Sequence, residues 1–162
     1  MPDMANNGIT LANAYEHIGE EIGLTDWVDI DQMQVNIFGE ITRWPTRGHN
    51  DPEWAERESP YGGTIIHGFF LLSLITYFVR VGGIDPADGA RSLNYGMNKA
   101  RVLQPVLIGD GIRVRDRIGL MEVVDKGKGK RLITTTHHIE VDGLGGPAAY
   151  VEYLNMWFPK VD

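Results

Sequence analysis

The chain has 162 residues, of which 15 are basic and 22 are acidic, so its formal net charge is −7. This length suits one domain with a substantial core, and the acidic balance argues against a surface that neutralises nucleic-acid phosphates. The absence of cysteine excludes disulfides, thiolate nucleophiles and thiolate metal ligands. Because no basic segment followed by an apolar one opens the sequence, we expect no secretory signal and a cytoplasmic protein.

The N-terminal part is predicted to hold one helix and a short apolar segment. Residues 1–8 are expected to be disordered. Apolar residues recur at helical spacing from Thr10 to Ile22, and Gly23 is a suitable stop, which together predict a helix. The short apolar segment follows at Trp27–Ile30.

The next part contains two predicted helix starts. Asp31 is a good N-cap for a helix that buries Val35, Phe38 and Ile41. That helix should end before Pro45, since the residue before a proline disfavours helical geometry. Residues 43–48 are then predicted to form an irregular loop. The sequence Asp51-Pro52 predicts a further short helix, with the aspartate as its cap and the proline in its first turn.

The most apolar stretch of the chain is Ile65–Val79, with sequence IIHGFFLLSLITYFV. A helix that is hydrophobic on every side must be enclosed by other structure. The stretch is shorter than the about 20 apolar residues of a membrane span, so we expect no membrane association. Turn residues at 60–63 precede this predicted central helix, and Gly82-Gly83 ends it.

Beyond residue 90 the hydrophobic period becomes two, which predicts strands. In Ile112–Leu120 apolar residues face one way and three arginines face the other. The sequence DKGKGK at 125–130 predicts a hairpin turn that leads into a partner strand, Arg131–Val141. A last strand at Pro147–Phe158 is apolar on both faces, so it should be central in a sheet or covered. These elements predict a single α+β domain over residues 1–162.

Two segments carry a family resemblance. The first is His49-Asn50-Asp51-Pro52 followed by GGTIIHGFFLLSL at 62–74, and the second is LNYGMNKARVLQPVLIGDGIRVR at 93–115. They resemble the MaoC-like hydratase and dehydratase family, particularly its branch similar to nodulation protein N, over Thr10–Pro159. The resemblance implies a hotdog fold, in which a curved antiparallel sheet wraps a long central helix, and a homodimer. It also implies reversible addition of water to a 2-enoyl-CoA, with CoA as part of the substrate and no other cofactor.

In that family an Asp and a His, five residues apart in a GD-x-x-x-x-H loop, hold and deprotonate the water. Carried over by position, the His is His49, and the backbone N–H that polarises the thioester carbonyl belongs to Gly68. The Gly-Asp pair falls on Arg43 and Trp44, and an indole cannot accept a proton as a carboxylate does. Thr76 stands where the family often has a small hydroxyl residue near the Asp.

Five residues are predicted to contact substrate: Arg43, Trp44, Arg47, His67 and Thr76. Guanidinium groups pair with carboxylates and phosphates, so the two arginines are candidates for an anionic ligand. The alternative interpretation is a solvated loop residue for each arginine and a structural hydrogen-bonding residue for His67.

Other polar residues are further candidates for the site. Asp51 is two residues from His49 and is either a replacement carboxylate or a helix cap. The lysines of the turn at 125–130 either meet a CoA phosphate or form a charged hairpin tip. His137 and His138 alternate on a strand, and neither has a recognisable ligand partner. Because metal-ligand spacing is absent from the sequence, we expect no metal.

Three functional hypotheses follow. The first is an acyl-thioester hydratase or dehydratase with a remodelled acid–base loop. The second is a hotdog protein without catalysis that binds a small anionic or acyl ligand or a partner. The third is an enzyme of altered chemistry, with a new pocket built by Trp44 and the two arginines. The expected partners are an acyl thioester and a second copy of the chain.

Overall fold

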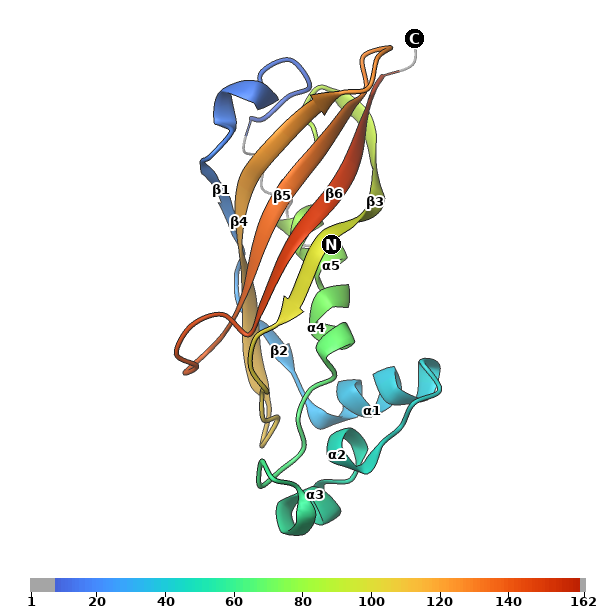
Figure 1. Ribbon diagram of the computed structural model, residues 1–162, viewed down its shortest axis with the longest axis vertical. Helices are drawn as coiled ribbons and strands as arrows, with labels where there is room; N and C mark the ends of the chain where they lie inside the picture. The colour runs from blue at the N-terminus through green and yellow to red at the C-terminus, as the bar shows by residue number, and fades with distance from the viewer. Residues whose placement is uncertain (1–7, 161–162) are drawn as a thin grey trace.

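The computed structural model describes residues 8–160, so residues 1–7 of the segment expected to be disordered lie outside it. Its main feature is a six-stranded sheet in the order β1-β4-β5-β6-β3, with β2 pairing separately with β4 (Figure 1). Every strand pair is antiparallel. The strands are β1 (Glu21–Leu24), β2 (Val28–Ile30), β3 (Gly89–Val102), β4 (Ile112–Asp125), β5 (Arg131–Val141) and β6 (Ala149–Pro159).

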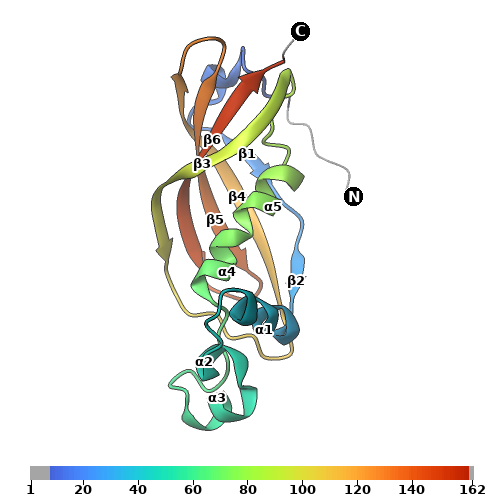
Figure 2. The ribbon, with the colours of Figure 1, turned by 90° about the vertical axis from the view of Figure 1, so that its right-hand side faces the viewer.

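The helices lie on one side of the curved sheet. The central helix, α4 followed by α5, runs along the concave face, whereas α1, α2 and α3 gather at one end (Figures 1 and 2). This arrangement confirms the predicted α+β class. No helix in the described part of the chain is both long and apolar enough to cross a membrane. The helical elements are a 3₁₀ turn η1 (Ala14–His17), α1 (Gln32–Ile41), α2 (Arg47–Asn50), α3 (Pro52–Glu58), α4 (Gly68–Ser73) and α5 (Ile75–Val81).

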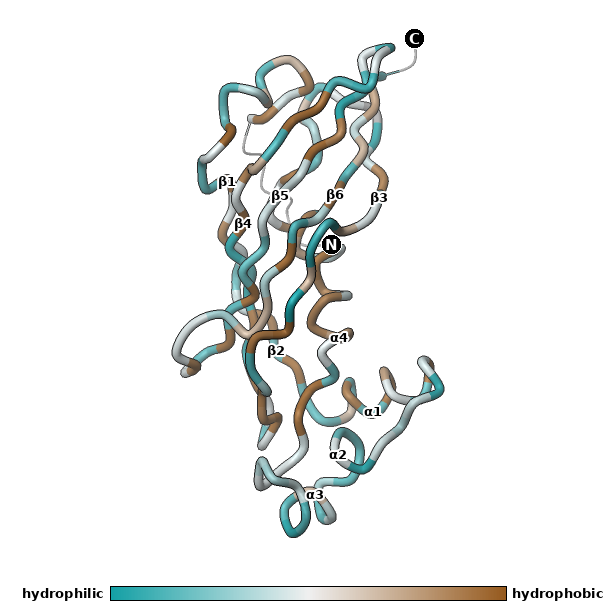
Figure 3. Tube along the Cα trace, in the orientation of Figure 1, coloured by the Kyte–Doolittle hydropathy of each residue, from teal (hydrophilic) through white to brown (hydrophobic). Residues whose placement is uncertain are grey.

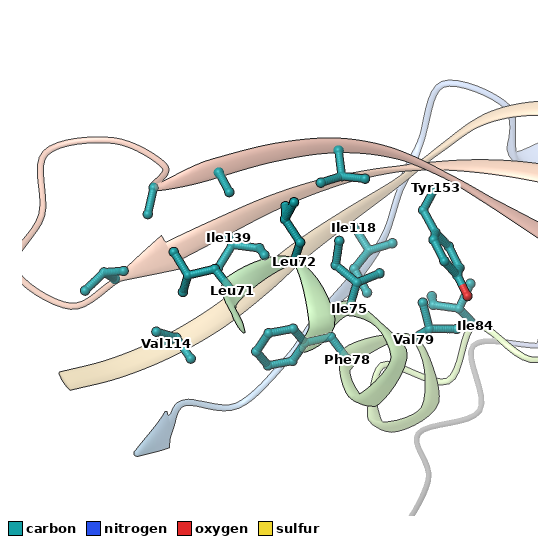
Figure 4. Close-up of a cluster of buried hydrophobic side chains, with 14 of the residues drawn as sticks. Leu71, Leu72, Ile75, Phe78, Val79, Ile84, Val114, Ile118, Ile139 and Tyr153 are labelled. Carbon is teal, nitrogen blue, oxygen red and sulfur yellow. The ribbon is translucent and has the colours of Figure 1, made fainter. Parts of the chain in front are cut away.

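The core forms between the central helix and the inner face of the sheet. Hydropathy is highest along the central helix and alternates along the strands (Figure 3). Leu71, Ile75 and Phe78 are fully buried, and they point toward strand residues such as Val114 and Ile139 (Figure 4). One side of the central helix nevertheless stays uncovered, because Phe69 is 79% exposed and Tyr77 is 41% exposed. The prediction that the helix is enclosed on every side was therefore wrong for the single chain.

The central helix also begins later than predicted. Ile65 forms a β-bridge with Leu107, and the Ile66 N–H donates to the Val106 carbonyl at 2.9 Å. These strand-like contacts use the backbone before Gly68, so helical geometry starts only there. At Leu74 the helix tightens, since its N–H donates to the carbonyls of both Phe70 and Leu71.

The predicted N-terminal helix over Thr10–Ile22 was wrong. Only the turn η1 is helical, and β1 occupies Glu21–Leu24 against β4. Asn13 explains part of this difference, because its side chain accepts hydrogen bonds from the backbone and hydroxyl of Thr10 and so competes with helix formation. The second reason is the edge of β4, whose backbone supplies hydrogen-bond partners that draw residues 21–24 into a strand.

The two helix starts that were predicted from capping residues were confirmed. Asp31 and Gln34 form a reciprocal capping box at the start of α1, and Asp51 caps α3 through the Trp54 N–H at 3.0 Å.

Ile41, expected on the buried face of α1, is instead 72% exposed. The loop predicted over 43–48 gives way to α2 at residue 47. In the sheet, β6 lies between β5 and β3, as its two apolar faces predicted.

Candidate functional site

Except for Thr76, which lies on α5, the predicted site residues lie where the loop after α1, α2 and the start of α4 meet (Figure 2). A cavity of about 580 Å³ lies among them. A second cavity of about 300 Å³ is lined by residues that include Tyr61, Leu71 and Val102. His49 and Gly68 line both cavities, so they stand between the two. The larger cavity is lined by Phe38, Thr42, Trp44, His49, His67, Gly68 and Phe69.

His49 is held in one tautomer by the backbone. It sits on α2, and its Nδ1 lies 2.7 Å from the carbonyl oxygen of Ile65. A carbonyl oxygen only accepts hydrogen bonds, so Nδ1 carries the proton in the neutral ring and Nε2 keeps its lone pair. The arrangement presents Nε2 as a general base.

His67 stacks on His49. The two ring centroids are 3.9 Å apart with 28° between the planes, and Phe38 packs against His67 at 5.2 Å. Burial lowers the pKa of His67, and the neighbouring His49 lowers that pKa further. The nearby Trp44 backbone acts to raise the pKa, but neither ring nitrogen of His67 makes a hydrogen bond with it. The site therefore disfavours protonation of His67.

Gly68 is the first residue of α4, where backbone N–H groups lack partners within the helix. A Cβ at this position would lie 2.7 Å from a methyl carbon of Val102. A side chain at this position would therefore force the Val102 side chain to move. The close approach keeps the Gly68 N–H beside both cavities, at the positive end of the helix dipole.

Trp44 is positioned by the way α1 ends. The Arg43 N–H donates to Glu40 at 3.1 Å and the Trp44 N–H donates to Gly39 at 2.8 Å, which is the hydrogen-bond pattern of a Schellman motif. Arg43 has φ +58°, a conformation that favours glycine. The position that aligns with the family's glycine thus has the backbone geometry of a glycine. The Trp44 side chain then lies against the larger cavity, 68% exposed.

No acidic residue lines either cavity in the described part of the chain. Asp51, considered as a replacement carboxylate, accepts the Trp54 N–H and lies 3.7 Å from Arg47. Its interpretation as a helix cap is therefore confirmed. The cavity offers two imidazoles and aromatic walls in place of a carboxylate.

Three of the predicted substrate-binding residues do not line either cavity. Arg43, after the end of α1, and Arg47, the first residue of α2, are exposed, and the Thr76 hydroxyl donates to the Ser73 carbonyl at 3.0 Å. The substrate-binding roles of these three residues stay predictions. The lysine-containing turn at 125–130 joins β4 to β5 at the end of the sheet opposite α1, α2 and α3 (Figure 1).

One buried polar pair was missed from the sequence. Asp116 and His137 are both fully buried, and Oδ2 of the first lies 2.5 Å from Nδ1 of the second. Thr135 Oγ1 is 2.8 Å from the other ring nitrogen. An aspartate at an apolar position of an alternating strand was the available signal. Neither residue lines the two cavities at His49, so the pair belongs to the core.

Comparison with known sequences gives one matching family model and several relatives. The model described as "MaoC like domain" matches residues 13–143. Nodulation protein N of Rhizobium leguminosarum bv. viciae is 32% identical over 148 residues, which cover 91% of each chain. A protein named 3-hydroxyacyl-thioester dehydratase Z from Mycobacterium tuberculosis is 38% identical over 140 residues, covering 84% of this chain and 87% of the relative.

Solved structures share the fold at lower identity. The monoamine oxidase regulatory protein from Archaeoglobus fulgius superposes with a TM-score of 0.77 at 19% identity, covering 98% of this chain and 99% of that one. R-hydratase PhaJ1 from Pseudomonas aeruginosa superposes with a TM-score of 0.70 at 17% identity, covering 94% and 88%. These likenesses extend over nearly the whole chain.

Proposed function

The chain belongs to the MaoC-like domain family, and on that premise we propose that it is an acyl-thioester hydratase or dehydratase with His49 as its base. The family resemblance and the hotdog fold predicted from the sequence are both confirmed. The observation that carries the proposed activity is the hydrogen bond from His49 Nδ1 to Ile65, which leaves Nε2 free between two cavities. A relative named for dehydration of 3-hydroxyacyl thioesters supports the same reaction class.

In the hydration direction, water attacks the β-carbon of a 2-enoyl thioester. His49 Nε2 takes a proton from the water as the new carbon–oxygen bond forms. Negative charge develops on the thioester oxygen, where the Gly68 N–H is suited to stabilise it. The imidazolium of His49 then gives its proton to the α-carbon, so His49 returns to its neutral form. Dehydration is the same sequence in reverse.

Trp44 limits this activity. A positioned acid–base group typically contributes about a hundred- to ten-thousand-fold to a rate, and the family's carboxylate is replaced here by an indole. We therefore expect slow hydration of ordinary 2-enoyl-CoA substrates. The proposed ligand is an acyl thioester, the CoA moiety enters as part of the substrate, and the proposed location is the cytoplasm.

A second function is favoured by the same substitution. A cavity with aromatic walls and no carboxylate suits a protein that binds an acyl ligand without converting it. An assay of crotonyl-CoA hydration, combined with thermal shifts induced by CoA esters, separates the two. Turnover supports the hydratase, whereas a thermal shift without turnover supports the binding protein. The absence of both would contradict both.

The proposed assembly is a homodimer through β3. This strand lies at the end of the sheet order, so one edge of its backbone has no strand partner in the described chain. Leu93, Tyr95 and Met97 on β3 are 51%, 63% and 43% exposed. The strand with two apolar faces, β6, is paired on both edges and offers none to a second copy. The other terminal strand, β1, has 4 residues, whereas β3 has 14, so β3 offers a second copy the longer edge.

A further inference from the structure

His67 is a buried polar side chain whose ring nitrogens are both unused. The residue is 7% exposed, and neither Nδ1 nor Nε2 has a hydrogen-bond partner. Native proteins seldom leave buried polar atoms unpaired, so such an atom needs an explanation. The ring lines the larger cavity, where a ligand can supply the missing partner.

Aromatic packing, rather than hydrogen bonding, holds the His67 ring. His49 stacks on it at 3.9 Å, and Phe38 contacts it at 5.2 Å and also stacks on Phe70 at 5.0 Å. Because no hydrogen bond fixes its tautomer, a neutral His67 can offer a donor at one nitrogen and an acceptor at the other. Its ring position is constrained while its hydrogen-bonding capacity stays free.

We propose that His67 is the second polar group of the reacting centre and that it binds the oxygen of the attacking water, which becomes the 3-hydroxyl of the product. This inference rests on the proposed hydratase function. His67 would take over part of the orienting role that the family gives to the carboxylate, and His49 would still carry the proton. His67 neither gains nor loses a proton over the cycle. The proton of the water therefore still passes through His49 to the α-carbon.

Charge in the cavity is consistent with this role. His49 and His67 are the titratable side chains among the described residues that line it. Burial and the neighbouring His49 lower the pKa of His67, which keeps its ring neutral when His49 accepts a proton. A neutral ring can bind a water or hydroxyl oxygen next to the imidazolium of His49 without adding a second positive charge.

Kinetics of crotonyl-CoA hydration test the proposal with two variants and a control. His67→Phe retains a flat ring for stacking but no hydrogen bond, and we expect kcat to fall about a hundredfold, as for a misoriented reactant, with little change in KM. His67→Asn should recover part of that loss. His138→Phe is the control, because that ring packs on Tyr150 on the outer face of the sheet. An active wild type matched by His67→Phe would overturn the inference and leave the proposed function standing.

A binding measurement gives a readout that does not need turnover. The imidazole ¹⁵N resonances of His67 should shift on addition of (R)-3-hydroxybutyryl-CoA and should shift much less with butyryl-CoA, which lacks the hydroxyl. Equal shifts with the two esters would overturn the inference alone. Binding of neither ester, together with an inactive wild type, would overturn the inference and the proposed function.

Discussion

At the scale of single residues, the chemistry of the site depends on what each imidazole can still bind. The Nδ1 hydrogen bond of His49 to a backbone carbonyl frees one nitrogen as a base, whereas His67 leaves both nitrogens unpaired. Trp44 occupies the position of the expected carboxylate and adds an aromatic wall to the cavity. The proposed reacting centre therefore consists of two imidazoles, His49 as the base and His67 as the group that orients the water, and it differs from the arrangement implied by the family.

The buried pair of Asp116 and His137 gives a prediction at the same scale. Burial raises the pKa of the Asp116 carboxyl, and the hydrogen bond from His137 opposes that shift. Asp116→Ala would leave His137 buried without its partner. A buried polar group that loses its hydrogen-bond partner costs about 1–3 kcal/mol, so urea denaturation should show a loss of that size in the free energy of unfolding.

The control for this pair lies on the surface. Asp142 pairs with Arg113, and both side chains are about half exposed at 47% and 53%. Asp142→Ala should cost roughly 0–1 kcal/mol, as is usual for exposed ion pairs. Equal losses for Asp116→Ala and Asp142→Ala would show that the buried pair contributes no more than an exposed one.

At the scale of elements, the end of α1 determines where Trp44 lies. Arg43 adopts φ +58° at the Schellman position that usually belongs to glycine. We expect Arg43→Gly to stabilise the protein by roughly 0.5–1 kcal/mol, because relief of left-handed strain exceeds the entropy cost of glycine. The change should appear as a higher urea midpoint with an unchanged slope.

Arg47→Gly is the matched control for this prediction. Arg47 opens α2 and is absent from the residues with positive φ, so glycine relieves no strain there. Its urea midpoint should stay the same or fall. If both glycine variants lower the midpoint, the Arg43 conformation carries no significant strain.

Elements with local signals were the ones that the sequence predicted correctly. The caps at Asp31 and Asp51 act within three residues, and the hairpin before β5 is signalled by its own turn. The failures depended on distant partners. Strand β1 exists because β4 supplies its hydrogen bonds, and the start of α4 is delayed because Ile65 pairs with Leu107. Helical periodicity carries no information about such contacts.

The same distinction applies to the site. Position within the family motif identified His49 and Gly68, which do line the cavities. The partner of His137 was missed because Asp116 is 21 residues away on the neighbouring strand. The unpaired nitrogens of His67 and the exclusion of acidic side chains from the cavities depend on three-dimensional packing, which no spacing in the sequence encodes.

At the scale of the whole molecule, the uncovered surfaces predict a dimer. An edge strand with exposed apolar side chains is a strong site for pairing with another chain. Sedimentation velocity at micromolar concentration should show a dimer, and Tyr95→Lys should shift it toward monomer by adding a positive charge to the proposed β3 interface on each copy. A wild-type monomer would contradict this assembly, as would a dimer that the substitution leaves unaffected.

We propose that His49 catalyses thioester hydration in a cavity where Trp44 stands in place of the family's carboxylate. The most direct test is the kcat/KM for crotonyl-CoA hydration by the wild type, Trp44→Asp and His49→Ala. We predict slow wild-type turnover, an increase toward about a hundredfold in Trp44→Asp as a carboxylate is restored, and loss of activity in His49→Ala. Fast hydration by the wild type that persists in His49→Ala would contradict the claim.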